Sequence, residues 1–290
     1  MTDTTTETVK LKIAVPNKGA LSEAAAVMLR EAGYRQRHDT KDLVLTDDEN
    51  DVEFYYLRPR DIAVYVGEGT LDIGITGRDM LLDSRAAAHE IMPLGFGRSK
   101  FRFAARPDGP QTLEALSGHR IATSYPGLLE TYLRENGVEA RLIHLDGAVE
   151  SAIRLGVADA IADVVETGTT LKRAGLQVFG DVICQSEAIV IGREQLEHGT
   201  QFQQLLRRLE GVLVARNYVM VDYNVASENL DAACALTPGL NGPTVSDLAQ
   251  AGWVAVRSLV PRKDSQRLLD SLYDVGARGI LLTDLSACRL

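Results

Sequence analysis

The sequence predicts an α/β fold made of two lobes, followed by a small ferredoxin-like module. Three observations support this prediction. Units in which a buried strand passes through a polar turn into an amphipathic helix recur between residues 11 and 175, which indicates helix-covered parallel sheets. A Pro/Gly-rich segment at 102–118 indicates a change of lobe. The last part of the chain instead follows a strand–helix–strand–strand–helix–strand order, which is typical of ferredoxin-like modules.

The first unit shows the repeated pattern. Residues 11–15, LKIAV, form an apolar strand, and the turn PNKG leads into a helix that ends at Gly33. The same pattern starts at residues 71–75, 119–124 and 158–165. In parallel sheets, ligands bind beyond the carboxyl ends of the strands. The candidate binding loops are therefore 16–20, 76–80, 124–128 and 163–170.

The later elements set the expected domain boundaries. We expect a lobe junction near residues 103–106, a return strand at 188–194 and a long helix over 194–215. After these come strands at 217–225, 243–249, 253–260 and 279–285, and helices at 227–236, with Ser227 as N-cap, and at 263–276. The prediction is lobe I at 1–103 and 188–210, lobe II at 104–187, and a C-terminal module at 211–290.

Composition excludes several functional classes. The net charge of −9 over 290 residues argues against nucleic acid as a partner, because such proteins usually carry a basic face. No apolar run approaches the roughly 18 residues of a membrane span, and the N-terminal MTDTTTETVK does not resemble a signal peptide. The three cysteines are isolated, so we expect a cytoplasmic protein. The five histidines lack the spacing of a metal site.

The segment DVVETGTTL, residues 163–171, suggests a specific ligand. Its threonines and Gly168 offer hydroxyl and N–H groups to an anion at the start of a helix, but the segment is not a P-loop. The carboxylates of Asp163 and Glu166 could accept hydrogen bonds from sugar hydroxyls or hold Mg²⁺ through water. A sugar phosphate satisfies both demands. The alternative is that the threonines cap a helix and the acids are solvated.

Four further residues lie in or beside the candidate loops. Lys18 and Arg58 could contact phosphate groups, or they could be ordinary surface cations. Asp79 could bind a ribose or a base, or it could only cap a helix. Tyr125 is expected to be exposed, where a purine could stack on it or where it would be a surface tyrosine in a turn.

Residues 150–171 resemble the signature of the ATP phosphoribosyltransferase family, the first enzyme of histidine biosynthesis. The matching residues are Glu150, Gly156, Asp159, Ile161, Asp163, Thr167, Gly168, Thr170 and Leu171. The resemblance runs from about residue 11 to the C-terminus and includes the C-terminal extension of the long, hexameric form. Many members have arginine where this chain has Ala20, which weakens the assignment of an ATP-phosphate contact at that position.

The resemblance implies that ATP and phosphoribosyl pyrophosphate react, with Mg²⁺, to give N1-(5-phosphoribosyl)-ATP and pyrophosphate. It implies a periplasmic-binding-protein-like catalytic unit, an ACT-like regulatory domain inhibited by histidine, and a homo-oligomer ranging from dimer to hexamer. AMP is a further ligand that it allows; nucleic acid and membranes are not expected partners.

The resemblance and the loop residues together give the expected site, in which no metal ligand is assigned. Catalytic roles fall on Lys18, Asp163 and Glu166, and ATP binding falls on Lys18, Arg58, Asp79 and Tyr125. Phosphoribose binding falls on Asp163, Val164, Val165, Glu166, Thr167, Gly168, Thr169 and Thr170. Histidine binding falls on Asn224, Leu240, Thr244 and Gly279.

Two other classes compete with this hypothesis. A solute-binding protein would share the two lobes but would need a signal sequence. An amino-acid sensor would explain the C-terminal module but not the segment ETGTT. No nucleophilic residue is required for the transfer, because adenine N1 already carries a lone pair, so catalysis should consist of positioning and charge stabilisation.

Overall fold

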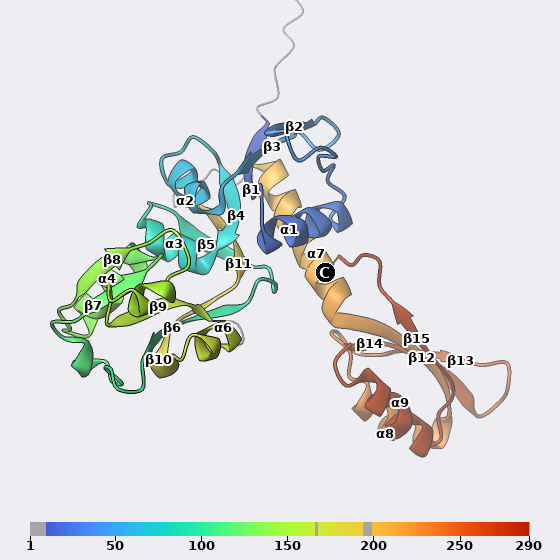
Figure 1. Cartoon of the computed structure of the whole chain (residues 1–290). Coiled ribbons are helices and arrows are strands. Elements are labelled where there is room, and N and C mark those ends of the chain that lie inside the picture. The colour runs from blue at the N-terminus through green and yellow to red at the C-terminus, as the bar shows by residue number, and fades with distance from the viewer. Residues whose placement is uncertain (1–9, 166–167, 194–198, 290) are drawn as a thin grey trace, which may run out of the picture. The chain divides into compact units, whose positions relative to one another are not determined.

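The structure is a computed structural model that describes residues 10–165, 168–193 and 199–289. It divides into two compact units (Figure 1). The first consists of residues 1–27 and 34–202, and the second of residues 28–33 and 203–290. The first unit contains two sheets and the second unit contains a third.

The first sheet belongs to lobe I and has the strand order β2-β3-β1-β4-β11-β5. Strands β3, β1 and β4 are parallel, and the other three join antiparallel. Almost every residue of β1 and β4 is buried, as expected for parallel strands covered on both faces. The elements of this lobe are β1 (Leu11–Pro16), α1 (Ala20–Glu31), β2 (Val44–Asp47), β3 (Val52–Leu57), α2 (Pro59–Gly67), β4 (Ile73–Gly77), α3 (Arg78–Ser84), β5 (His89–Pro93) and β11 (Ala188–Gly192).

The second sheet belongs to lobe II and has the order β10-β6-β9-β7-β8. Neighbouring residues of β6 point to opposite faces, so Phe103 and Ala104 enter two separate hydrophobic cores. The elements of this lobe are β6 (Ser99–Ala105), η1 (Glu114–Leu116), β7 (Arg120–Thr123), α4 (Pro126–Glu135), β8 (Arg141–His144), α5 (Ser151–Arg154), β9 (Ala160–Val165), α6 (Thr169–Arg173) and β10 (Gln177–Ser186).

The chain passes between these sheets twice, from β5 to β6 and from β10 to β11. The expected boundary after residue 103 divides β6, so sheet membership moves that boundary back to residues 94–98. The long helix α7 (Thr200–Asn217) extends past the expected end of lobe I at residue 210. Residues 194–198, the first part of that predicted helix, lie outside the described residues.

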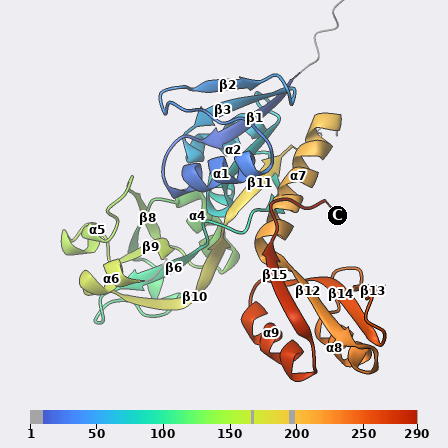
Figure 2. The ribbon, with the colours of Figure 1, turned by 90° about the vertical axis from the view of Figure 1, so that its right-hand side faces the viewer.

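The C-terminal module confirms the predicted ferredoxin-like topology. Its sheet is antiparallel with the order β13-β14-β12-β15, and α8 and α9 cover one face (Figure 2). The predicted N-cap at Ser227 is wrong, because Ser227 begins a 3₁₀ turn and Asn229 precedes α8 without a side-chain cap. The elements are β12 (Tyr218–Ala226), η2 (Ser227–Asn229), α8 (Leu230–Leu236), β13 (Thr244–Asp247), β14 (Trp253–Pro261), α9 (Ser265–Asp274) and β15 (Arg278–Asp284).

Within the described part of the chain, no helix is both long enough and apolar enough to cross a membrane.

Candidate active site

Three of the predicted loops converge. Asp79 lies at the start of α3, Tyr125 follows β7, and Asp163 lies near the end of β9. Phe101 packs against the Tyr125 ring and pairs in the sheet with Val164, the residue after Asp163. Burial raises the pKa of the Tyr125 hydroxyl, and the charges of Asp79 and Asp163 raise it further. The arrangement follows from the fold, because β4, β7 and β9 are strands whose carboxyl ends carry these residues.

Asp79 is held by a serine from a distant part of the chain. Its side chain is 5% exposed, and the Ser186 hydroxyl donates to Asp79 Oδ1 at 2.8 Å. The same hydroxyl oxygen accepts the Asp79 backbone N–H at 3.0 Å. Ser186 ends β10, where the chain returns to lobe I, and it lies outside the predicted binding loops. Its local sequence carries no signal, because its partner is 107 residues away.

Tyr125 is buried, so the predicted exposure is wrong. Only 7% of the residue is exposed, and its ring packs edge-on against Phe101 with centroids 5.3 Å apart. Burial raises the pKa of its hydroxyl well above the ordinary range, as does the negative charge of Asp79, while the Arg60 guanidinium opposes the rise. A purine therefore finds no open face of Tyr125 in this arrangement, because Phe101 and Arg60 cover the ring.

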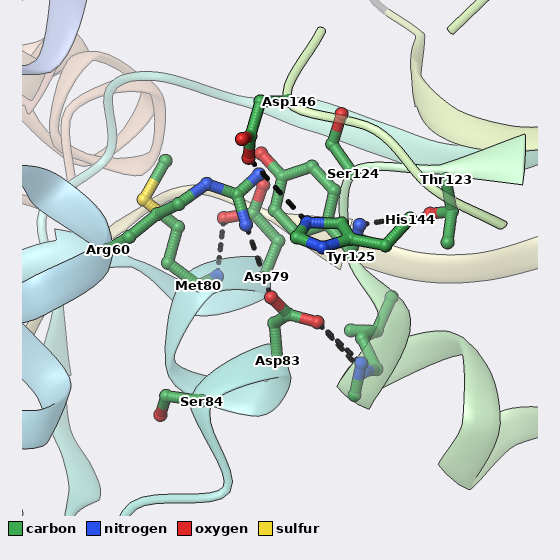
Figure 3. A network of polar contacts seen from close by, with 12 residues as sticks. Arg60, Asp79, Met80, Asp83, Ser84, Thr123, Ser124, Tyr125, His144 and Asp146 are labelled. Carbon is green, nitrogen blue, oxygen red and sulfur yellow. Dashed lines mark hydrogen bonds and ion pairs between the residues drawn. The ribbon is translucent and has the colours of Figure 1, made fainter.

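Arg60, from α2, connects the two lobes. Its guanidinium carbon lies 4.5 Å from the centre of the Tyr125 ring, and its Nη1 lies 3.2 Å from Asp83 Oδ2. Figure 3 shows Arg60 beside Asp79, Asp83 and Tyr125. Arg60 lies two residues after the predicted ligand Arg58, which is the N-cap of α2 and is exposed. Asp61 lies in the first turn of α2.

Asp83 of lobe I contacts the first turn of α4 in lobe II. Its Oδ1 accepts the backbone N–H groups of Gly127 at 2.8 Å and Leu128 at 3.2 Å. A carboxylate at a helix N-terminus satisfies unpaired donors and complements the helix dipole. Arg85 adds an ion pair to Glu130 at 2.6 Å. The two lobes are thus joined by specific polar contacts near the candidate site.

The carboxylate of Asp163 lies in an environment that disfavours its charged form. Burial raises its pKa, the backbone N–H of Val164 lowers it, and the negative charge of Glu150 raises it further. The cost of this environment would be offset by a ligand that donates hydrogen bonds or brings positive charge. In the sheet, Val164 and Val165 pair with Phe101 and Lys100.

The remainder of the predicted phosphoribose loop is described in part. Gly168 has φ +70 and precedes α6, a helix of five residues whose first turn contains the exposed Thr169 and Thr170. Glu166 and Thr167 lie outside the described residues. Because α6 has only five residues, its helix dipole gives little support to the predicted anion binding by this loop.

Lys18 occupies a tight turn after β1. It is exposed, and the following Gly19 has φ +78, a left-handed conformation that glycine adopts without strain. The backbone N–H of Asn17 donates to the carbonyl of Leu57 at 2.8 Å. The turn that carries Lys18 and the strand end that carries Arg58 are therefore directly joined.

A hollow of about 680 Å³ lies where the chain passes between the lobes. Its lining includes Val165 and Ser186 and the cationic side chains of Arg78, Arg98 and Lys100. Arg78 is engaged by Glu90 through two bonds of 2.7 Å. This hollow joins the end of β9 to the serine that holds Asp79, and its cations suit an anionic ligand.

The described residues contain no cluster of three or more His, Cys, Asp or Glu side chains able to enclose a metal ion. Carboxylates are nevertheless present where a divalent cation would be stabilised. Burial raises the pKa of Asp163, and the negative charges of Glu150 and Asp79 raise it further. The Asp163 carboxylate is by its chemistry an oxygen ligand of the kind that a hard cation prefers.

The predicted histidine-binding residues lie in the C-terminal module. Asn224 adjoins Gly279, since a Cβ on Gly279 would lie 3.5 Å from Asn224 Nδ2. Thr244 starts β13, separated from β12 by β14, and Leu240 lies in the preceding loop. The strand registers place Asn224 and Thr244 on the sheet face opposite the helices, with Ala255 of β14 beside Asn224.

Comparisons with known proteins show which family this chain resembles. The family model described as HisG, ATP phosphoribosyltransferase, matches residues 58–211, and the model of the HisG C-terminal domain matches residues 215–287. ATP phosphoribosyltransferases from Arthrobacter sp. (strain FB24) and Streptomyces coelicolor are each 59% identical, over 97% of this chain and all of their own length. The Micrococcus luteus protein of the same name is 60% identical with the same coverage.

A solved structure shows the same relationship. The ATP phosphoribosyl transferase (HisG:HisZ) complex from Thermotoga maritima contains a chain that is 26% identical and matches with a TM-score of 0.58. The match covers 69% of this chain and 98% of the other.

Proposed function

Because the chain belongs to the ATP phosphoribosyltransferase family, we propose that it condenses ATP with 5-phosphoribosyl 1-pyrophosphate, the sugar donor. The products would be N1-(5-phosphoribosyl)-ATP and pyrophosphate, in the first step of histidine biosynthesis. Family membership makes the chain a pentosyltransferase. The observation that carries the proposal is the convergence of Asp79, Tyr125 and Asp163, from three strand ends, beside the signature loop.

The signature loop would bind the sugar donor. Asp163 would accept hydrogen bonds from the ribose hydroxyls, and residues 164–170 would surround the 5-phosphate. The crowded environment of Asp163 supports this role, since donors from the ribose would offset the cost of its buried charge. Glu166 retains its proposed catalytic role as a second hydroxyl anchor.

Asp79 would orient the purine of ATP. The Ser186 hydroxyl holds its carboxylate, so the acceptor is fixed before the ligand arrives. Tyr125 would support this acceptor from the lobe II side through the phenol that faces Asp79, rather than by stacking on the base. This role replaces the one predicted from its expected exposure.

Transfer requires cleavage of the bond between ribose C1 and the pyrophosphate oxygen as adenine N1 approaches C1. Lys18 and Arg58 would neutralise the negative charge that develops on the departing pyrophosphate. We propose Mg²⁺ as the cofactor; Asp163 would help to hold it through water, and when bound it would supply further positive charge to the leaving group.

The C-terminal module would bind histidine as a feedback inhibitor. Asn224 and Thr244 share the sheet face opposite the helices; Asn224 lies beside the small Ala255, and Thr244 pairs with the neighbouring Arg257. Leu240 and Gly279 would complete that site. AMP as a second regulator, assembly of the chain into a dimer to hexamer, and a cytoplasmic location stay predictions.

One assay tests the reaction. Purified protein is mixed with ATP, the sugar donor and Mg²⁺, and the absorbance change that accompanies alkylation of adenine N1 is followed. We expect a change that requires both substrates. Folded protein that binds ATP but produces no change would contradict the proposed catalysis and indicate a binding role.

A further inference from the structure

The guanidinium of Arg37, near the proposed pyrophosphate site, is held by several hydrogen bonds. It lies in the loop between α1 and β2, and it donates to three backbone carbonyls: those of Asn17 at 2.9 Å, Thr40 at 2.8 Å and Asp42 at 2.7 Å. Thr40 and Asp42 belong to its own loop, whereas Asn17 belongs to the turn after β1. Arg37 therefore joins two segments that no strand pairing connects.

The carbonyl that Arg37 holds belongs to the peptide that links Asn17 to Lys18. The backbone N–H of Asn17 is also engaged, through its 2.8 Å bond to the carbonyl of Leu57, the residue before Arg58. The main chain immediately before each proposed pyrophosphate cation is thus fixed by the same small network. Lys18 is followed by Gly19 in a left-handed conformation, and on its N-terminal side Asn17 is restrained by its contacts to Arg37 and Leu57.

Tyr56 fixes Arg37 in turn. The guanidinium carbon lies 4.0 Å from the centre of the Tyr56 ring, and the backbone N–H of Arg37 donates to the Tyr56 hydroxyl at 3.2 Å. Tyr56 is only 4% exposed, and its own N–H donates to Leu43 at 2.9 Å. A guanidinium stacked on a buried ring loses little further freedom when it binds carbonyls in its plane.

We propose that Arg37 is a positioning residue for Lys18, and through Asn17 and Leu57 for Arg58, in the transfer of the phosphoribosyl group. This inference rests on the proposed function of those two cations. Arg37 need not touch the substrate, because its donors are directed to backbone carbonyls. Lysine could not replace it, since an ammonium group cannot reproduce the planar set of donors that reaches three carbonyls.

The test is a double-mutant cycle in the full-length chain with Arg37→Gln, Lys18→Ala and the combination. If Arg37 acts through Lys18, Arg37→Gln should lower kcat/KM for the sugar donor by about 10²-fold, the order expected for a misplaced catalytic group. The Lys18→Ala change should then cost much less in the Arg37→Gln background than in the native chain, because contacting residues that act together are not additive.

Arg120→Gln is the matched control. Arg120 also donates to a backbone carbonyl, that of Gly156 at 2.9 Å, but it lies at the start of β7, away from the strand ends that carry the site. This variant should lower the melting temperature while leaving the effect of Lys18→Ala unchanged. Full additivity of Arg37→Gln and Lys18→Ala would overturn the inference and leave Arg37 as a structural link.

Two further outcomes keep the inference separate from the proposed function. If Lys18→Ala alone leaves the kinetics unchanged, the assigned role of Lys18 is wrong, and so is the positioning role. If Arg37→Gln does not fold, Arg37→Lys replaces it, because lysine keeps the charge above Tyr56 but not the three carbonyl contacts. Native kinetics in that variant would also overturn the inference.

Discussion

Asp83 of lobe I and Gly127 of lobe II are in direct contact, and this contact joins the two lobes. The Asp83 carboxylate accepts the Gly127 N–H at 2.8 Å, and the Asp83 carbonyl occupies the space where a side chain on residue 127 would lie. Glycine is therefore required at this position by the neighbouring lobe rather than by its own backbone conformation, which does not have positive φ. Close packing of this kind fixes the start of α4, next to Tyr125.

Gly127→Ala should destabilise the protein by about 1–3 kcal/mol, the usual cost of overpacking, because the obstructing atoms belong to the main chain and cannot rotate away. Chemical denaturation monitored by circular dichroism measures the loss. Gly199→Ala is the control: its nearest atom is a glutamine side-chain oxygen 3.5 Å away, and we expect a change within about 0.5 kcal/mol. Equal stability of the two variants would show that the lobes can separate at this contact without cost.

Ser186→Ala should raise KM for ATP by roughly 10-fold, since a buried carboxylate and an N–H would lose a shared partner. KM for the sugar donor should change little. Ser84→Ala removes a hydroxyl from the other end of α3, where it donates to the Leu81 carbonyl at 2.7 Å, and it should leave both constants unchanged. Steady-state kinetics with each substrate varied would separate these outcomes.

Asp163→Asn should stabilise the protein while it impairs catalysis. The pKa of Asp163 is raised in the folded protein, so the folded state binds its proton more tightly than the unfolded state does. The stability that this provides is fully present below the unfolded pKa and is lost as pH rises through the folded pKa. The variant should melt higher than the native chain at neutral pH, and the difference should shrink under acid conditions. Loss of a charged hydrogen bond should lower kcat/KM for the sugar donor roughly 10- to 100-fold. Native kinetics would contradict the proposed hydroxyl anchor.

Asp159 should show the opposite pH dependence. Hydrogen bonds from Arg120, first from its side chain and then from its backbone, lower the Asp159 pKa from 3.8 to about 2. The stabilisation is therefore fully present above the unfolded pKa and is lost as pH falls from about 4 to about 2. Asp159→Asn should lower the melting temperature at neutral pH, and the two melting curves should converge over that window. A constant difference across it would refute the assignment.

Asn224→Asp should strengthen inhibition by histidine. A carboxylate beside Gly279 could pair with the ammonium group of the ligand, which the native amide cannot do. A charged hydrogen bond contributes about 1.5–3 kcal/mol, so the concentration giving half-inhibition should fall roughly 10-fold or more. The check is a histidine titration of both proteins at fixed substrate concentrations. Identical inhibition curves would remove Asn224 from the proposed regulatory site.

The parts of the molecule that follow local patterns could be predicted from the sequence. The strand–turn–helix units are recognisable because apolar runs end at polar turns, and the alternating burial of β12 reflects its alternating side chains. The exposure of Tyr125 was wrong because Phe101 and Arg60, which cover its ring, come from other elements. Ser186 had no local signal, since its partner Asp79 is distant in sequence, and the contacts of Arg37 with Asn17 and Tyr56 likewise depend on the tertiary fold. Family membership could be recognised because the signature is contiguous.

The strand order of lobe I affects how the chain can fold during synthesis. Strand β5 pairs only with β11 in the described sheet, and β11 is synthesised after all of lobe II. While the ribosome synthesises residues 99–186, β4 and β5 therefore lack the strand that lies between them. During this time lobe I has unpaired strand edges, which are prone to wrong pairing. Lobe II is contiguous and has its own cores. We expect lobe II to fold first. Strand β11 would then pair with β4 and β5, so that the sheet of lobe I is completed last.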